Sequence, residues 1–408
     1  MSGSHTGALR PISANFGTSL GPGVFIPILL GILLWLAMPR LLVSPVRTFL
    51  SISVGFGWLF SMTLAMEGRG ISALTTPFTQ TGNYWSQVPI VQRLGPRAFD
   101  AAYPQLFRYS YPIAHAAVHP PGALLLLWTL SRVTGGSAGI TCAIVALIGV
   151  LGAVPTYALT RRAYGERAAR GAALFFACSS GVLLYAPTVD SIFVTITAIA
   201  LVALQRATTS DSWALGAGVL SAVALCFTFG AIALAPLFLG MMFLARKDVP
   251  TWTLARRAAL VVAGIILAAV AVRITLSIDL VAIFRSVMGA QRHFDQFSGR
   301  LYRYWVWADP VALFISVGLA VTTLFVAETR VRWRLRSPGL ESVLLLTVLL
   351  LTVTGLNRGE TDRVWLLLAP VVCAAAAASA NDLEVRWVAA AGLAQALVIQ
   401  CLLIVGGR

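Results

Sequence analysis

The sequence predicts an all-α, polytopic transmembrane bundle of about 12–13 helices. Hydrophobic residues make up 58% of the 408-residue chain and charged residues only 11%, and many apolar runs approach the length of a membrane span. Soluble domains carry about 25% charged residues. The runs lack the two-residue alternation of a barrel strand, so helices must satisfy the backbone within lipid.

The N-terminal residues 1–23 form a polar tail in this interpretation. They lack a basic stretch followed directly by a short apolar run and an A-x-A site, so we do not expect a cleaved signal peptide. Residues 24–408 are predicted to form a single transmembrane domain, because no low-complexity linker or internal repeat divides them.

Apolar runs place the spans in order. We expect them at about residues 24–38, 50–65, 138–159, 171–185, 192–204, 213–227, 231–244, 258–274, 306–327, 343–354, 365–378 and 387–405. A shorter apolar piece lies at 123–130. Short basic connectors separate several spans, and the positive-inside rule places these connectors in the cytoplasm.

The first loop, residues 66–122, is long and polar, and the same rule places it outside the cytoplasm. Residues 85–94 and 99–107 mix aromatic and leucine side chains with polar ones, which is typical of short helices lying in a membrane interface. Simple aromatic anchoring explains each aromatic residue equally well. Long ordered loops between spans usually carry function.

The loop closes with His119-Pro120-Pro121-Gly122. Two full crossings between residues 120 and 160 would put the basic pair Arg161-Arg162 outside, so we favour a half-span or re-entrant piece after the prolines. The number of crossings stays open at this point. The motif also fits an ordinary helix start, since proline is favoured in the first turn.

The net charge of +15 comes from basic residues in short connectors, such as those between residues 330 and 336. Membrane topology and anionic headgroups explain this charge, and we expect no nucleic-acid partner. The five cysteines lie in apolar runs without CxxC spacing and are expected to be packing residues. Four histidines without an HExxH motif argue against a zinc site.

Five groups of charged residues fall on the same predicted outer side: Glu67, His119, Asp190, the stretch 292–303 and the stretch 358–363. Charges near membrane spans are costly, so a shared outer cavity would explain them, although each alone fits an interfacial charge. Clustered arginines suit phosphate or pyrophosphate, and a neighbouring carboxylate can take a proton from a hydroxyl. This chemistry indicates a lipid-phosphate substrate and a hydroxyl acceptor.

The order of an apolar span, an acid, an aromatic loop, His-Pro-Pro-Gly and a further apolar run resembles membrane glycosyltransferases of the GT-C fold. The closer likeness is to actinobacterial mannosyl- and arabinofuranosyl-transferases that use polyprenyl-phosphate sugars. Three further stretches carry it: Ala186-Pro187-Thr188-Val189-Asp190, Tyr302-Arg303-Tyr304-Trp305-Val306-Trp307 and residues 355–365. The resemblance spans about residues 55–370.

The resemblance implies that Glu67, at the end of the second span, is the catalytic base, where similar proteins usually have Asp. We then expect inverting transfer from a polyprenyl-phosphate sugar to a glycan or glycolipid acceptor on the outer face of a bacterial plasma membrane. Donor phosphate would be held by Arg303, Arg358, Arg363 and His119. Sugar or acceptor orientation would fall to Asp190, Glu360 and Tyr304.

Similar proteins often carry acids midway through the first loop, where this chain has Asn83 and Gln87. Neither amide can act as a base, which concentrates the catalytic role on Glu67. Membrane lipids are expected partners, no cofactor is implied with certainty, and a divalent cation is compatible with the site. A transporter or lipid flippase, and a non-catalytic envelope-assembly protein, are the alternative functions.

Overall fold

The computed structural model describes residues 14–16, 21–67, 70–80, 82–106, 115–297, 300–355 and 358–405. Helices dominate these residues, which confirms the all-α polytopic class. The chain divides into two compact units, and each is built from discontinuous segments. The first comprises Met1–Leu74, Ala143–Ala198 and Leu301–Arg408, and the second Thr75–Cys142 and Ile199–Arg300. The assignment of residues 24–408 to a single domain stays a prediction.

The first unit contains two short 3-10 helices, long apolar helices and several short, buried ones. Its elements are η2 (Pro22–Val24), α1 (Phe25–Val43), α2 (Val46–Met66), α8 (Ala153–Tyr164), α9 (Glu166–Ala177), α10 (Ser180–Tyr185), α16 (Tyr302–Val317), α17 (Leu319–Arg334), α18 (Leu340–Thr354), α19 (Thr361–Val364), η5 (Trp365–Leu368), α20 (Ala369–Ala376) and α21 (Asp382–Leu402). Three helices, α3 (Ile71–Thr79), α7 (Ala138–Val150) and α11 (Asp190–Ala207), run from one unit into the other.

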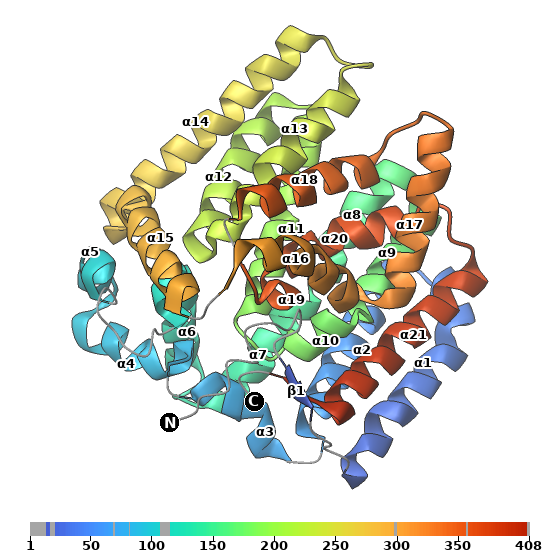
Figure 1. Ribbon diagram of the computed structural model, residues 1–408, viewed down its shortest axis with the longest axis horizontal. Coiled ribbons are helices and arrows are strands. Elements are labelled where there is room, and N and C mark those ends of the chain that lie inside the picture. Colours follow the sequence, from blue (N-terminus) through green and yellow to red (C-terminus); the bar gives the residue numbers. More distant parts are fainter. Residues whose placement is uncertain are drawn as a thin grey trace. The chain divides into compact units, whose positions relative to one another are not determined.

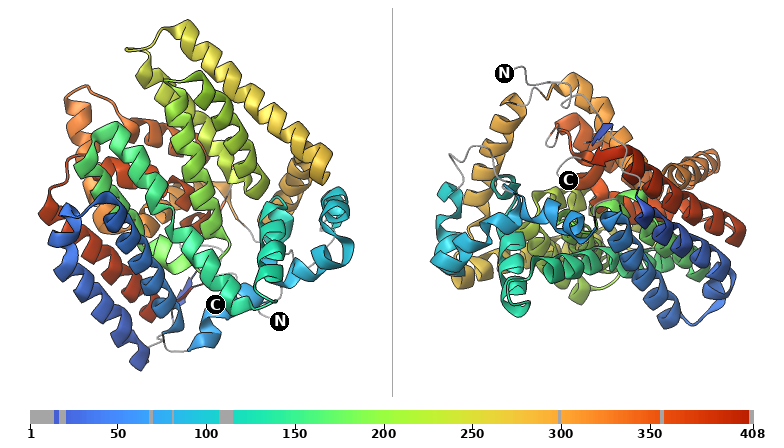
Figure 2. Two further views of the ribbon diagram at one scale, coloured as in Figure 1. Left: turned by 180° about the vertical axis from the view of Figure 1, so that it is seen from behind. Right: turned by 90° about the horizontal axis from the view of Figure 1, so that it is seen from below.

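Helices α1, α2 and α21 pack side by side within the first unit (Figures 1 and 2). Pro45 precedes α2 and separates it from α1, as expected where proline cannot continue a helix. The guanidinium of Arg170 donates to the carbonyls of Leu42 and Ser44 at 3.0 and 2.8 Å, which satisfies free carbonyls at the end of α1. A short antiparallel ladder joins β1 (Ala14–Phe16) to β2 (Leu403–Val405).

The second unit contains α4 (Tyr84–Leu94), α5 (Pro96–Leu106), η3 (His115–Val118), α6 (Gly122–Val133), α12 (Asp211–Phe227), η4 (Phe229–Ala233), α13 (Leu234–Ala245), α14 (Thr251–Leu276) and α15 (Leu280–Phe297). The interfacial helices expected at 85–94 and 99–107 correspond to α4 and α5. Helices α12 and α14 approach closely, since a Cβ on Gly218 would lie 2.1 Å from the carbonyl oxygen of Val261.

Six helices of the described residues are long and apolar enough to cross a membrane: Pro22–Val43, Val46–Met66, Ala138–Tyr164, Asp190–Ala207, Thr251–Leu276 and Asp382–Leu402. Four shorter apolar helices accompany them, including α6 and α18. At about 1.5 Å per residue, α6 spans only roughly 18 Å of a 30 Å hydrocarbon core, which agrees with the length expected of a half-span.

Three expected spans differ from the structure. Residues 171–185 form α9 and α10, broken at Cys178 and Ser179, and residues 365–378 form η5 and α20; these short helices are almost entirely buried in protein. The span expected at 306–327 is α16 and α17, bent by 109° at Gly318, whose φ is +124°. Hydropathy alone does not distinguish burial in protein from burial in lipid.

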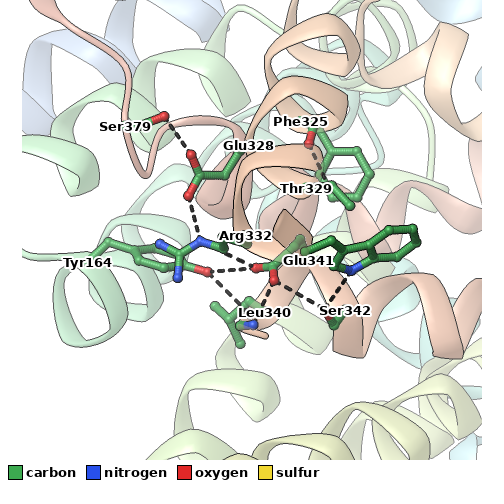
Figure 3. A network of polar contacts seen from close by, with 11 residues as sticks. Tyr164, Phe325, Glu328, Thr329, Arg332, Leu340, Glu341, Ser342 and Ser379 are labelled. Carbon is green, nitrogen blue, oxygen red and sulfur yellow. Dashed lines mark hydrogen bonds and ion pairs between the residues drawn. The ribbon is translucent and has the colours of Figure 1, made fainter. Parts of the chain in front are cut away.

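A buried polar network joins α8, α17, α18 and the end of α20 (Figure 3). The Arg332 guanidinium donates to Glu328 at 2.5 Å and lies 3.8 Å from the Glu341 carboxylate. The second oxygen of Glu328 accepts from the Ser379 hydroxyl at 2.6 Å, and the Tyr164 hydroxyl lies 3.5 Å from Glu341. These contacts hold the ends of four segments together beside the basic connector 330–336.

Candidate functional site

The candidate site in the first unit is built around α19 and the turn before it. Asp309, buried within α16, accepts hydrogen bonds from the Gly359 amide and the Thr361 hydroxyl, both at 3.1 Å. These bonds fix the start of α19 to α16. The sequence interpretation missed Asp309, although an acid inside an otherwise apolar run is itself a signal.

Arg363 of α19 brings together two residues that are far apart in the sequence. Its guanidinium forms a hydrogen-bonded ion pair with Glu360 and lies 3.7 Å from the Asp190 carboxylate at the start of α11. The arginine and aspartate side chains are only 17% and 8% exposed. Burial alone would lower the pKa of Arg363, but Glu360, Asp190 and Asp362 raise it well above its ordinary value. The guanidinium is therefore permanently charged.

Asp362 contacts a different helix from the one that Arg363 contacts. Its carboxylate accepts a hydrogen bond from the Tyr185 hydroxyl at the end of α10, and both side chains are buried. Three expected site residues, Asp190, Glu360 and Arg363, thus form one cluster, to which Tyr185, Asp309 and Asp362 contribute the surrounding contacts. We call these six residues the α19 cluster.

The other expected residues of this region lie on and beside α16. The Arg358 guanidinium lies 5.4 Å from the ring centre of Tyr302, whose hydroxyl donates to the Val353 carbonyl at 2.8 Å. Arg303 is exposed and forms no ion pair among the described residues. Tyr304 is half-buried and packs edge-on against Trp305 with ring centres 5.2 Å apart.

Glu67 immediately follows α2 and is only 1% exposed. One carboxylate oxygen accepts the Gly21 amide hydrogen at 2.7 Å, and the other has no hydrogen-bond partner among the described residues. The Ser61 hydroxyl of α2 donates to the Leu183 carbonyl of α10 at 2.8 Å, two residues before Tyr185. Helix α2 therefore packs on the helix that carries Tyr185, while Glu67 forms no hydrogen bond with the α19 cluster in the described part of the chain.

His119 belongs to the second unit. Its carbonyl accepts a hydrogen bond from the Tyr103 hydroxyl at 2.7 Å, and its ring centre lies 6.0 Å from that of Tyr84. Pro121 directly precedes α6, so the motif stands at the start of a helix, and a role for His119 in phosphate binding stays a prediction. Gly122 is required there, because a Cβ would lie 2.4 Å from the Cys226 carbonyl oxygen. A cavity shared by His119 and the first unit stays a prediction.

The middle of the first loop contains an acid that the sequence interpretation missed. Asn83 occupies the position before α4, and the Gln87 amide donates to the Ser86 hydroxyl at 3.0 Å. Asp100 of α5, however, is only 1% exposed, and burial raises the pKa of its carboxyl to about 7. In the sequence, Asp100 falls on the same face of the expected helix as Phe99 and Tyr103, and this position could have indicated that it is buried.

No group of three or more His, Cys, Asp or Glu side chains that could hold a metal ion occurs among the residues that the structure describes. All five cysteines are buried and free of disulfides, as expected of packing residues.

Comparison with known proteins gives a match to one family model and matches to solved structures. Residues 118–275 match the family model described as dolichyl-phosphate-mannose-protein mannosyltransferase, over less than half of the chain. No curated protein matches the chain. The crystal structure of ArnT from Cupriavidus metallidurans in the apo state is 18% identical, with a TM-score of 0.48 over 73% of this chain and 54% of that chain. This chain thus covers about half the length of ArnT.

Proposed function

We propose that this chain is a membrane glycosyltransferase of the GT-C type. It moves a sugar from a polyprenyl-phosphate donor to a hydroxyl of a glycan or glycolipid acceptor on the outer face of a bacterial plasma membrane. The observation that carries the proposal is the α19 cluster, in which Asp190, Glu360 and Arg363 meet from separate parts of the chain. The family match over residues 118–275 supports it.

The reaction is an inverting displacement in this proposal. Glu67 takes the proton of the acceptor hydroxyl, and the hydroxyl oxygen attacks the anomeric carbon of the sugar. The bond between that carbon and the phosphate oxygen breaks, and the polyprenyl phosphate leaves with both electrons of the bond. The unpartnered oxygen of Glu67 is the one suited to accept the proton.

Arginine side chains stabilise the departing phosphate in this scheme, and their surroundings assign them two different roles. Arg363 is surrounded by carboxylates, so we assign it mainly to holding Asp190 and Glu360 in place for the sugar hydroxyls. Arg303 is exposed and Arg358 half-buried, which suits them better to a lipid phosphate. His119 is a further phosphate contact, and Tyr304 a contact for the sugar.

A transfer assay tests the proposal. Purified protein in proteoliposomes is offered defined polyprenyl-phosphate sugars and a lipid-linked glycan acceptor, and the covalent product is measured. We expect Glu67→Gln to lower the transfer rate by about 10²–10⁴-fold, because loss of a general base costs that much. Glu384→Gln is the matched control, since Glu384 is exposed at the start of α21 and should retain the wild-type rate.

Two results would count against the proposal. Absence of transfer by the wild-type protein from every donor offered contradicts glycosyltransferase activity. Full activity of Glu67→Gln contradicts only the assignment of the base.

Transport is a second candidate function, because the bent pair α16 and α17 resembles the discontinuous helices that build binding sites in transporters. The same proteoliposomes distinguish it: a transporter moves the labelled lipid-linked sugar across the bilayer without forming a covalent product.

A further inference from the structure

Asp100 is an unusual carboxyl group for its position in the second unit. It is 1% exposed, and neither carboxylate oxygen has a hydrogen-bond partner among the described residues. Burying a carboxylate without a partner is so costly that such groups normally take up a proton instead. The proposed transfer reaction assigns no role to this residue.

The group lies at the centre of the contacts that dock α5. Phe99, Asp100 and Tyr103 form the buried face of this helix, with the two rings packed edge-on at 5.4 Å. The Tyr103 hydroxyl donates to the carbonyls of Ala116 and His119 at 2.5 and 2.7 Å. Tyr103 lies one helical turn after Asp100. Through its hydroxyl, α5 therefore holds the segment that leads into Pro120-Pro121-Gly122.

Two more hydrogen bonds fix the ends of α5. The Arg97 guanidinium donates to the Ser277 hydroxyl at 3.3 Å, and the Ser286 hydroxyl of α15 donates to the Pro104 carbonyl at 2.8 Å. Arg97 is thus directed away from Asp100 although both lie on one helix. No basic side chain of α5 therefore neutralises the charge of the Asp100 carboxylate.

The described residues of the elements packed against α5 bring no compensating charge either. Helices α4, α14 and α15 pack against α5, and among the described residues the Asp100 charge acts on Tyr103 and on Cys226 of α12. The other titratable groups on these elements and on η3 form no ion pair or hydrogen bond with Asp100: Tyr84, Arg93, His115, Arg256, Arg257, Arg273, Arg285, Arg292, His293 and Asp295.

We propose that Asp100 is a protonation-dependent latch in the outer loop. Its neutral carboxyl allows α5 to dock, and its ionisation releases α5 together with the segment 115–121 that Tyr103 holds. A proton is the ligand that controls the latch, and residues 115–121, which lead into α6, are the segment that the latch holds.

The direction of the pH effect follows from the raised pKa of about 7. An acid whose pKa is higher in the docked state than the usual value near 3.8 binds its proton more tightly when docked. Docking is therefore strongest below about pH 4, weakens as pH rises from about 4 to 7, and is constant above that window.

Hydrogen exchange tests the proposal without any assay of transfer, so its failure is distinct from failure of the proposed function. Protection factors of the α5 amides are measured in detergent between pH 5 and pH 8, with the intrinsic exchange rate divided out and α12 as internal reference. In the wild-type protein we expect the relative opening constant of α5 to rise about tenfold for each pH unit between 5 and 7, and to level off above 7.

Asp100→Asn keeps the shape of the side chain and cannot ionise, so α5 protection should become independent of pH. Asp248→Asn is the matched control, since Asp248 is exposed in the connector after α13 and its replacement should preserve the wild-type profile. A wild-type profile that is flat between pH 5 and 8, or the same slope in Asp100→Asn, would overturn the latch.

Discussion

Single residues of the α19 cluster differ in what they hold. Asp362 is 0% exposed and receives the Tyr185 hydroxyl, while Arg363 beside it faces Asp190 and Glu360. Adjacent residues of one short helix thus direct opposite charges toward two other helices, α10 and α11. The orientation of α19 depends on both contacts.

Tyr185→Phe tests the first of these contacts. Removing the hydroxyl leaves a buried carboxylate oxygen without that donor, which costs about 1–3 kcal/mol of unfolding free energy. We expect a lower midpoint of thermal unfolding in detergent. In an Asp362→Asn background the same substitution should cost clearly less, because the two side chains interact directly; equal costs in both backgrounds would contradict the contact.

The sequence allowed part of this residue-scale picture to be predicted. Asp190, Glu360 and Arg363 lie at the ends of apolar runs, where a charged side chain is costly and therefore indicates a function. The structure brings these three residues together in one cluster. Asp309 and Asp100 were not predicted as site residues, because each lies inside a helical run. The run around Asp309 is apolar and the run around Asp100 is amphipathic. Burial of a single acid depends on tertiary packing that the local pattern does not contain.

At the scale of elements, continuous apolar runs gave the best predictions. Helices α1, α2, α14 and α21 lie close to their expected positions. The runs 171–185 and 365–378 misled because protein surrounds them on all sides, and a helix buried in protein is as apolar as one in lipid. The bend at Gly318 depends on a positive φ, which glycine permits but does not require.

The contact between α12 and α14 makes a prediction at this scale. In Gly218→Ala, the new methyl group would meet the Val261 carbonyl oxygen at 2.1 Å, so the helices must separate, at a cost of about 1–3 kcal/mol. Gly216→Ala, on the same helix, has nothing within 4 Å of its Cβ and should be neutral or slightly stabilising. Thermal unfolding midpoints measure both, and equal effects of the two substitutions would contradict the close packing.

For the whole molecule, composition was enough to predict a polytopic helical membrane protein. The number of long spans was not predictable, because about 12–13 apolar runs resolve, in the part of the chain that the structure describes, into six long helices, a bent pair and several shorter helices. Which side each connector faces rests on the distribution of basic residues.

Thiol labelling in intact cells tests that orientation. We expect a membrane-impermeant maleimide to label Arg93→Cys on α4, in the outer loop, and to label Arg334→Cys, at the end of α17, only after permeabilisation. Both positions are exposed, and the five native cysteines are buried and provide the background. Labelling of Arg334→Cys in sealed cells would invert the proposed topology.

The polar network around Arg332 also has a consequence for the order of biosynthesis. Ser379 is made 51 residues after Glu328, a delay of roughly 3–10 s at ordinary rates of translation. Arg332, one helical turn after Glu328, is available almost at once. The growing chain therefore supplies Glu328 with a nearby cation before its distant hydroxyl partner emerges from the ribosome, and α17 can be inserted without waiting for α20.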